Sequence, residues 1–275
     1  MLHCGDMLKT RIILILVSCA LVVVLFMLPK VVVENDQTDV GATADTTSKQ
    51  SDVHAATPPK IAVSIRNLRN QYSANSTNEK NAIFADSLAN LYSLAGKFDS
   101  AAWFAEKASE FFNNTESWIK AGDQYYQAFN FALEAGKQTQ YAARAQSYYN
   151  KVLAKTPDNL DVKTKLAMTH LTEANPMKAI GMLREVLVQD PKNELALYNM
   201  GMLSIQSGQY DRAIERLQQL VEINPGNTQA QLLLGIAYMN AGQRNKAKEQ
   251  FNKVKLLDSD PSVQATVDSY LKDLK

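Results

Sequence analysis

A period of 34 residues constrains the fold of this chain more than any other sequence feature. Residue types with different roles share this spacing: Ala179, Ala213 and Ala247; Pro191 and Pro225; Gly201 and Gly235. Such a period indicates an internal repeat in which each unit is one supersecondary element and adjacent units share a core.

The pattern within one unit predicts two helices. In residues 194–227, apolar residues recur at helical spacing in both halves, and Gly208 separates the halves. Gly201 and Ala213 are small, as required where two helix backbones approach closely, and Pro225 lies where a helix cannot continue.

These units resemble the tetratricopeptide repeat, which has a small residue at position 8, Ala at 20, a large apolar residue at 24 and Pro near 32 of its 34 positions. The resemblance implies an all-α, right-handed solenoid of helix pairs. We expect units at 82–114, 115–159, 160–193, 194–227 and 228–261, a leading helix at 60–72 and a closing helix at 262–274. We expect these residues to be structural: Gly122, Ala145, Ala179, Gly201, Ala213, Gly235, Ala247, Pro157, Pro191 and Pro225.

The unit at 115–159 is longer than the others. Its closing proline, Pro157, comes 11 residues after position 146, where the period places it. Eleven residues correspond to about three helical turns, so we expect a longer helix pair around Gly136 that protrudes from the stack.

An uncharged apolar segment, residues 12–28, precedes the repeats. Its length of 17 residues is at the short end for a membrane span. Because Lys9 and Arg11 precede it, we expect a cytoplasmic N-terminus, starting at Met1 or Met7. We favour an uncleaved anchor in residues 1–30 over a cleaved signal peptide.

A second interpretation of this segment is a bacterial lipoprotein signal. Leu16-Val17-Ser18-Cys19 resembles a lipobox, but nine apolar residues continue after the cysteine. Residues 31–59 are mostly polar and are expected to form a flexible linker. Residues 60–275 then form the solenoid.

The composition argues against several functions. Lys plus Arg is 29 and Asp plus Glu is 28, so the net charge of +1 does not favour nucleic-acid binding. Nucleotide-binding glycine motifs and a zinc-protease motif are missing from the sequence. The two cysteines, Cys4 and Cys19, precede the repeats, and His170 falls at a helix-packing position. We therefore expect no enzyme activity, metal, cofactor or small-molecule substrate.

The resemblance implies that first-helix positions 2, 5, 6, 9, 12 and 13 line a concave groove. The groove candidates are Met168, Leu171, Tyr198, Asn199, Met202, Ile205, Leu232, Ile236, Met239 and Asn240. Relatives that capture a C-terminal carboxylate use a polar clamp at position 6. Here that position holds Lys165, Asn199 and Leu233, so the clamp is broken. An apolar helix or extended segment suits these residues, although positions 9 and 12 could equally serve to pack one unit on the next.

We therefore expect a protein-binding scaffold in the inner membrane, with its solenoid in the bacterial periplasm. One alternative is an outer-membrane lipoprotein of envelope assembly, attached through Cys19. Another is a regulatory subunit of an envelope enzyme. A eukaryotic lumenal protein is a further alternative, in which Asn75 and Asn113 would be glycosylation acceptors.

Overall fold

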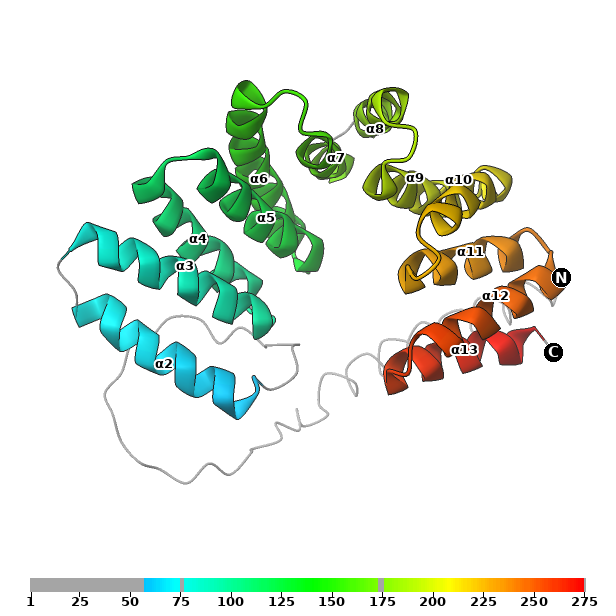
Figure 1. The fold of residues 1–275 in the computed structure, drawn as a ribbon, viewed down its shortest axis with the longest axis horizontal. Helices are drawn as coiled ribbons and strands as arrows, with labels where there is room; N and C mark the ends of the chain where they lie inside the picture. Colours follow the sequence, from blue (N-terminus) through cyan, green and yellow to red (C-terminus); the bar gives the residue numbers. More distant parts are fainter. Residues whose placement is uncertain (1–56, 75–76, 173–175, 275) are drawn as a thin grey trace, which may run out of the picture. The chain divides into compact units, whose positions relative to one another are not determined.

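The structure is a computed structural model that describes residues 57–74, 77–172 and 176–274. All regular secondary structure in these ranges is helical (Figure 1). The elements are α2 (Pro59–Ala74), α3 (Asn78–Leu94), α4 (Phe98–Phe112), α5 (Thr115–Phe131), α6 (Ala135–Lys155), α7 (Leu160–Thr169), η1 (His170–Thr172), α8 (Met177–Gln189), α9 (Glu194–Gln206), α10 (Tyr210–Ile223), α11 (Thr228–Asn240), α12 (Arg244–Leu257) and α13 (Pro261–Asp273).

The helices pack in consecutive pairs, each against the next. The pairs are α3–α4, α5–α6, α7–α8, α9–α10 and α11–α12, with α2 packed on the first pair and α13 on the last. This arrangement confirms the predicted all-α stack of helix pairs. The largest difference from the predicted bounds is at α3, which begins at Asn78, four residues before the predicted start at 82, so the first helix of this pair has an additional turn. The leading and closing helices differ from their predicted bounds by one or two residues.

Glycines end the first helix of three pairs. Gly96, Gly208 and Gly242 have φ angles of 69°, 71° and 74°, a left-handed conformation that glycine adopts without a side-chain clash. The next amide then bonds back into the helix, as where Gln209 N donates to Ser204 O at 2.8 Å. Gly208 therefore separates the two helices of its unit, as the sequence predicted.

The connection between units is a tight turn followed by a helix cap. Asn193 N donates to Asp190 O at 3.1 Å, with Pro191 next after the acceptor, where its fixed φ fits the turn. The Asn193 side chain then accepts from Ala196 N at 2.9 Å and caps α9. Pro157 and Pro225 occupy equivalent turns.

The connection between α12 and α13 has a different helix cap from the connections between units. Asp260 accepts from the Ser262 and Val263 amides, and Pro261 stands in the first turn of α13. Proline suits this place because the first amides of a helix have no partner within the helix. The displacement of proline from the 34-residue period thus marks the start of a closing helix.

The 11 additional residues of the second unit lengthen both helices of its pair. Compared with the α9–α10 pair, α5 has 17 residues rather than 13, and α6 has 21 rather than 14, so 4 + 7 = 11. Gly136 lies in the first turn of α6, rather than in the loop between the helices.

The predicted head and anchor, residues 1–30, and all but the last three residues of the predicted linker, 31–59, lie outside the described residues, and Pro59 is already part of α2. None of the helices within the described ranges is long and apolar enough to cross a membrane.

Candidate partner-binding face on the first helices

The first helices of the five pairs form one continuous row. Contacts join α5 to α7, α7 to α9 and α9 to α11, while an ion pair between Asp86 and Lys120 joins α3 to α5. We refer to positions 2, 5, 6, 9, 12 and 13 of these helices as the first-helix face.

In α9 and α11, the glycine at position 8 marks the side that packs against the paired second helix. A Cβ atom built on Gly201 would lie 2.7 Å from Leu217 of α10, and one on Gly235 would lie 2.6 Å from Phe251 of α12. Both second-helix partners occupy position 24 and are fully buried. The expected close approach is therefore present at both glycines.

In α9 and α11, the first-helix face is apolar and partly exposed. Six of the predicted groove residues have apolar side chains of intermediate burial, which pack on the core and leave part of their surface in solvent: Tyr198, Met202, Ile205, Leu232, Ile236 and Met239. We call these six residues the apolar section. Asn240 is exposed at the end of α11, so seven of the predicted groove residues have accessible surface here.

The other three predicted groove residues are not part of this section: two are buried, and one lies in the turn after α7. Met168 is 4% exposed and belongs to the core, since it packs with Leu183 and Met200. Asn199 is 5% exposed, and its amide donates to Leu195 O at 2.8 Å. Leu171 is half-buried in the 3₁₀ turn after α7. The prediction that Met168 and Asn199 line an open surface is therefore wrong, because both side chains are buried.

In α5 and α7 the same face carries charged groups, and in α3 it carries Asp86 together with the exposed Ile83 and Leu94. Lys120 Nζ lies 3.2 Å from Asp86 and 3.4 Å from Glu116, and Lys165 Nζ lies 2.8 Å from both carboxylate oxygens of Asp123. Including the exposed Asp161 at position 2 of α7, six residues form what we call the charged section: Asp86, Glu116, Lys120, Asp123, Asp161 and Lys165.

The polar groups of a carboxylate clamp are engaged within the chain. Lys165 pairs with Asp123, which also accepts from the Tyr149 hydroxyl at 2.8 Å. Asn199 bonds its own helix, and Leu233 is apolar and packs partly on the core. Lys165 and Asn199 are therefore already engaged by groups of the chain itself.

A second polar cluster, centred on Glu106, was not found from the sequence. The Glu106 carboxylate of α4 pairs with Arg144 of α6 at 2.9 Å and accepts from the hydroxyls of Tyr125 and Tyr148. Burial raises the pKa of Tyr125, and the neighbouring Glu106 carboxylate raises it further. The partners are 19 to 42 residues apart, so no local spacing indicated them. The cluster joins three helices and serves packing.

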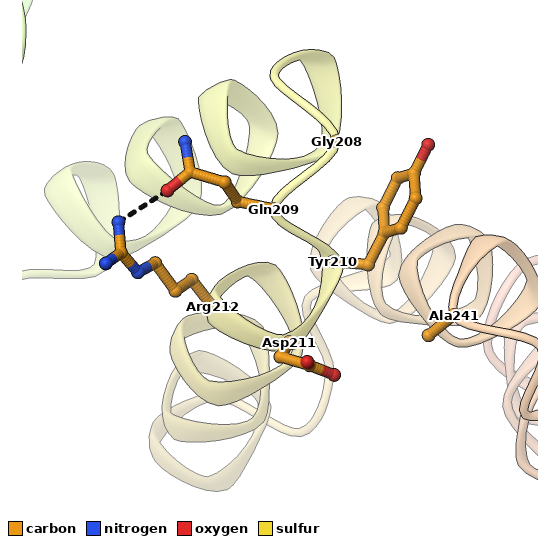
Figure 2. Close-up of a pocket in the computed structure, with 6 residues that line it drawn as sticks. All are labelled: Gly208, Gln209, Tyr210, Asp211, Arg212 and Ala241. Carbon is orange, nitrogen blue, oxygen red and sulfur yellow. Dashed lines mark hydrogen bonds between the residues drawn. The ribbon is translucent and has the colours of Figure 1, made fainter.

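A surface hollow at the turn between α9 and α10 has polar walls (Figure 2). Its volume is about 480 Å³, and its lining consists of Gly208, Gln209, Tyr210, Asp211, Arg212 and Ala241. Arg212 donates to Gln209 within the same turn. This hollow brings together neither a nucleophile with a base nor a set of metal ligands.

His170, the histidine of the repeats, is a packing residue. It is 6% exposed, and its Nδ1 lies 3.2 Å from the Gln146 amide nitrogen of α6. Among the described residues, no group of three or more His, Cys, Asp or Glu side chains could hold a metal ion.

Two protein-family models, both described as tetratricopeptide repeat, match this chain over residues 164–227 and 204–268. Residues 164–268 are tetratricopeptide repeats. The matched range contains the apolar section, and it begins within α7, after the units that carry most of the charged section.

Solved structures show the same fold. A tetratricopeptide repeat protein from Parabacteroides merdae is 15% identical, with a TM-score of 0.60, and the match covers 78% of each chain. A thermophilic tetratricopeptide repeat protein from Thermus thermophilus is 17% identical, with a TM-score of 0.54, and the match covers 69% of this chain and 98% of that one. No curated protein matches the chain.

Proposed function

We propose that this chain is a membrane-tethered scaffold that binds an apolar helix or extended segment of a partner protein on the apolar section. Proteins built from tetratricopeptide repeats mediate protein–protein interaction, and residues 164–268 are such repeats. One observation carries the choice of surface: on α9 and α11 the first-helix face holds eight partly exposed apolar side chains, the six of the apolar section together with Leu195 and Leu233, and no charged one.

The composition of the apolar section supports an apolar ligand. Met202 and Met239 are flexible and polarizable, so they can adapt to the shape of a bound segment. Tyr198 presents a ring and a hydroxyl, a combination that is common at binding surfaces. An apolar helix in a groove is bound through contacts of this kind.

The direct test replaces two residues at position 9 of adjacent units. Met202→Glu with Ile236→Lys places opposite charges on the apolar section, and binding energy usually concentrates in a few such central residues. In affinity purification of the full-length chain, we expect the co-purified partner to be lost, while the helical circular dichroism signal and membrane attachment persist. Loss of helicity would assign both residues to packing between units. Unchanged partner recovery with an intact fold would refute the proposed surface.

The cellular location is part of the same proposal. The uncharged segment at residues 12–28 and the preceding Lys9 and Arg11 support an inner-membrane anchor with the solenoid in the periplasm. A reporter that is active only in the periplasm, fused after Lys275, should work. Activity of a cytoplasm-restricted reporter at the same place would contradict this topology.

The lipobox-like sequence that ends at Cys19 favours one alternative, a lipoprotein of envelope assembly. Mass spectrometry of the mature N-terminus separates the two. An acylated Cys19 at the first position would show the lipoprotein, whereas residues preceding Cys19 would show the anchor.

A further inference from the structure

The first-helix face changes in chemistry along the stack, and the change occurs between α7 and α9. In α9 and α11, its positions hold no Asp, Glu, Lys or Arg. In α3, α5 and α7, the same positions hold the four carboxylates and two ammonium groups of the charged section. A segment that crosses the row of first helices therefore meets an uncharged region and then a region with an excess of two negative charges.

The two lysines of the charged section are engaged by carboxylates. Lys165, with 27% of its side chain exposed, contacts both oxygens of Asp123 at 2.8 Å. Lys120 lies between Asp86 and Glu116. A partner carboxylate would have to compete with these existing pairs to reach either ammonium group, and it would be repelled by the excess negative charge.

The carboxylates, in contrast, include groups open to a cation. The Glu116 side chain is 80% exposed, and Asp161 is exposed in the first turn of α7. Both occupy position 2 of their units, which is the position of Leu195 in α9. A Lys or Arg of the partner could approach these carboxylates without breaking an existing buried contact.

We infer that the partner segment is apolar over α9 and α11 and carries Lys or Arg over α5 and α7; this inference rests on the function proposed above. Packed helices lie roughly 10 Å apart, and an extended chain advances about 3.3 Å per residue. Asp161 and Glu116 lie one and two first helices away from α9, so in an extended segment the basic residues fall about three to six positions from the apolar stretch. Complementary charge at this place sets the direction in which the segment lies.

A random 16-residue peptide library displayed on phage tests this inference with a defined probe. The library is selected on the immobilised full-length chain and, in parallel, on the Met202→Glu, Ile236→Lys variant. We expect enriched peptides to carry an apolar cluster with Lys or Arg on one side of it at the stated separation, and Asp and Glu to be depleted. Enrichment of basic residues should be about two- to fivefold for each contact, because exposed ion pairs are weak.

A charge-removing variant separates the contribution of the carboxylates. Selection on Glu116→Gln, Asp161→Asn should keep the apolar cluster and lose the basic preference. The matched control, Glu215→Gln, Glu222→Gln, removes two exposed carboxylates from the second helix α10 and should leave the preference unchanged.

The outcomes distinguish the two proposals. Apolar clusters without a basic preference, or with one that Glu116→Gln, Asp161→Asn leaves intact, would overturn the inference and leave the proposed function standing. Peptides that enrich equally on the wild type and on the Met202→Glu, Ile236→Lys variant would overturn both.

Discussion

The two ends of the repeat stack reach the same architecture by different means. In the C-terminal units, a glycine at position 8 accommodates a large residue at position 24, as with Gly201 and Leu217. In the α3–α4 unit, two alanines, Ala89 and Ala105, fill these positions and both are buried. Because both helices have a small residue where they meet, glycine is not needed at position 8. The α3–α4 unit therefore keeps the helix-pair fold although its sequence matches the repeat pattern less well.

The ends also differ in the groups that join the helices. Around α5 and α6, tyrosine hydroxyls and ion pairs connect neighbours, including the Glu106 cluster and the Asp123–Tyr149–Lys165 contacts. Around α10 to α13, the buried core is mainly aliphatic, with Phe251 stacked on Tyr270. The comparison suggests that the two ends should respond differently to pH and similarly to loss of a helix cap.

Alkaline pH should give the largest difference between the two ends. Burial raises the pKa of Tyr149 well above its usual value, and the Asp123 carboxylate raises it further; burial also raises the pKa of Tyr126 and Tyr148. A tyrosine whose pKa is higher in the folded state stabilises the fold fully below about pH 10, and this contribution is lost as the pH rises above that value. For each such tyrosine that stays protonated in the folded state, the free energy of unfolding falls by about 1.4 kcal/mol per pH unit above pH 10.

Tryptophan emission can follow this loss in one end of the stack. Both tryptophans, Trp103 and Trp118, lie in α4 and α5, whereas far-ultraviolet circular dichroism reports all helices. Between pH 8 and pH 12, the wavelength of maximum emission should shift before the circular dichroism signal falls. Tyr149→Phe should make the dependence on pH less steep. Coincident transitions would show that the two ends unfold as one unit.

Overpacking at Gly201 should give the next largest effect. A side chain there meets Leu217 at 2.7 Å, so Gly201→Leu should lower the free energy of unfolding by about 3 kcal/mol, the upper end for overpacked cores. Urea denaturation followed by circular dichroism measures this loss. The control, Gly226→Ala, adds a methyl group at an ordinary distance of 3.7 Å from Asn224 Oδ1 and should cost much less. Equal losses would mean that the repeat register is wrong.

Removal of a helix cap should have a smaller effect, of similar size at both ends. Asn193→Ala removes the acceptor for Ala196 N and should cost about 1 kcal/mol; Asn114→Ala, at the start of α5, should cost a similar amount. Asn193→Ser keeps a capping oxygen and should retain most of the stability. The same urea denaturation measures all three, and a loss confined to one end would contradict the shared role of these caps.

The smallest predicted effect is a gain. Gly136 lies in the first turn of α6 with no neighbouring atom within 4 Å of an added Cβ, so Gly136→Ala should raise stability by up to about 1 kcal/mol. Gly208→Ala is the opposite case, because its φ of 71° disfavours any side chain, and it should destabilise the chain. A destabilised Gly136→Ala variant would show that an added methyl group in this turn of α6 does meet another part of the chain.

The sequence predicted the helix pairs because small residues, turn glycines and prolines recur at a fixed spacing. It also located the 11 additional residues, which lengthen α5 and α6. The repeat period also contains the helix-capping asparagines, which were not predicted. Asn159, Asn193 and Asn227 follow the same 34-residue period and cap α7, α9 and α11. Their polar side chains carry no signal in a search for apolar periodicity.

The candidate site was less predictable than the fold. Position in the repeat indicated which side of each first helix faces outward, but the degree of burial depends on adjacent units, as Met168 and Asn199 show. The pairing of Lys165 with Asp123 joins residues 42 positions apart, and no local pattern indicates such a contact. The charged section therefore emerged only once the first helices were placed side by side.

Site-specific photo-crosslinking tests the central claim, that the apolar section is the partner-binding surface. A benzophenone amino acid replaces Met239 on the apolar section, Leu133 in the loop between α5 and α6, or Val188 on α8; the last two side chains are 83% and 82% exposed. After irradiation of intact cells that contain the full-length chain, we expect one discrete adduct from position 239 and none from positions 133 or 188. An adduct from position 133 without one from position 239 would contradict the account and place recognition on the long α5–α6 pair.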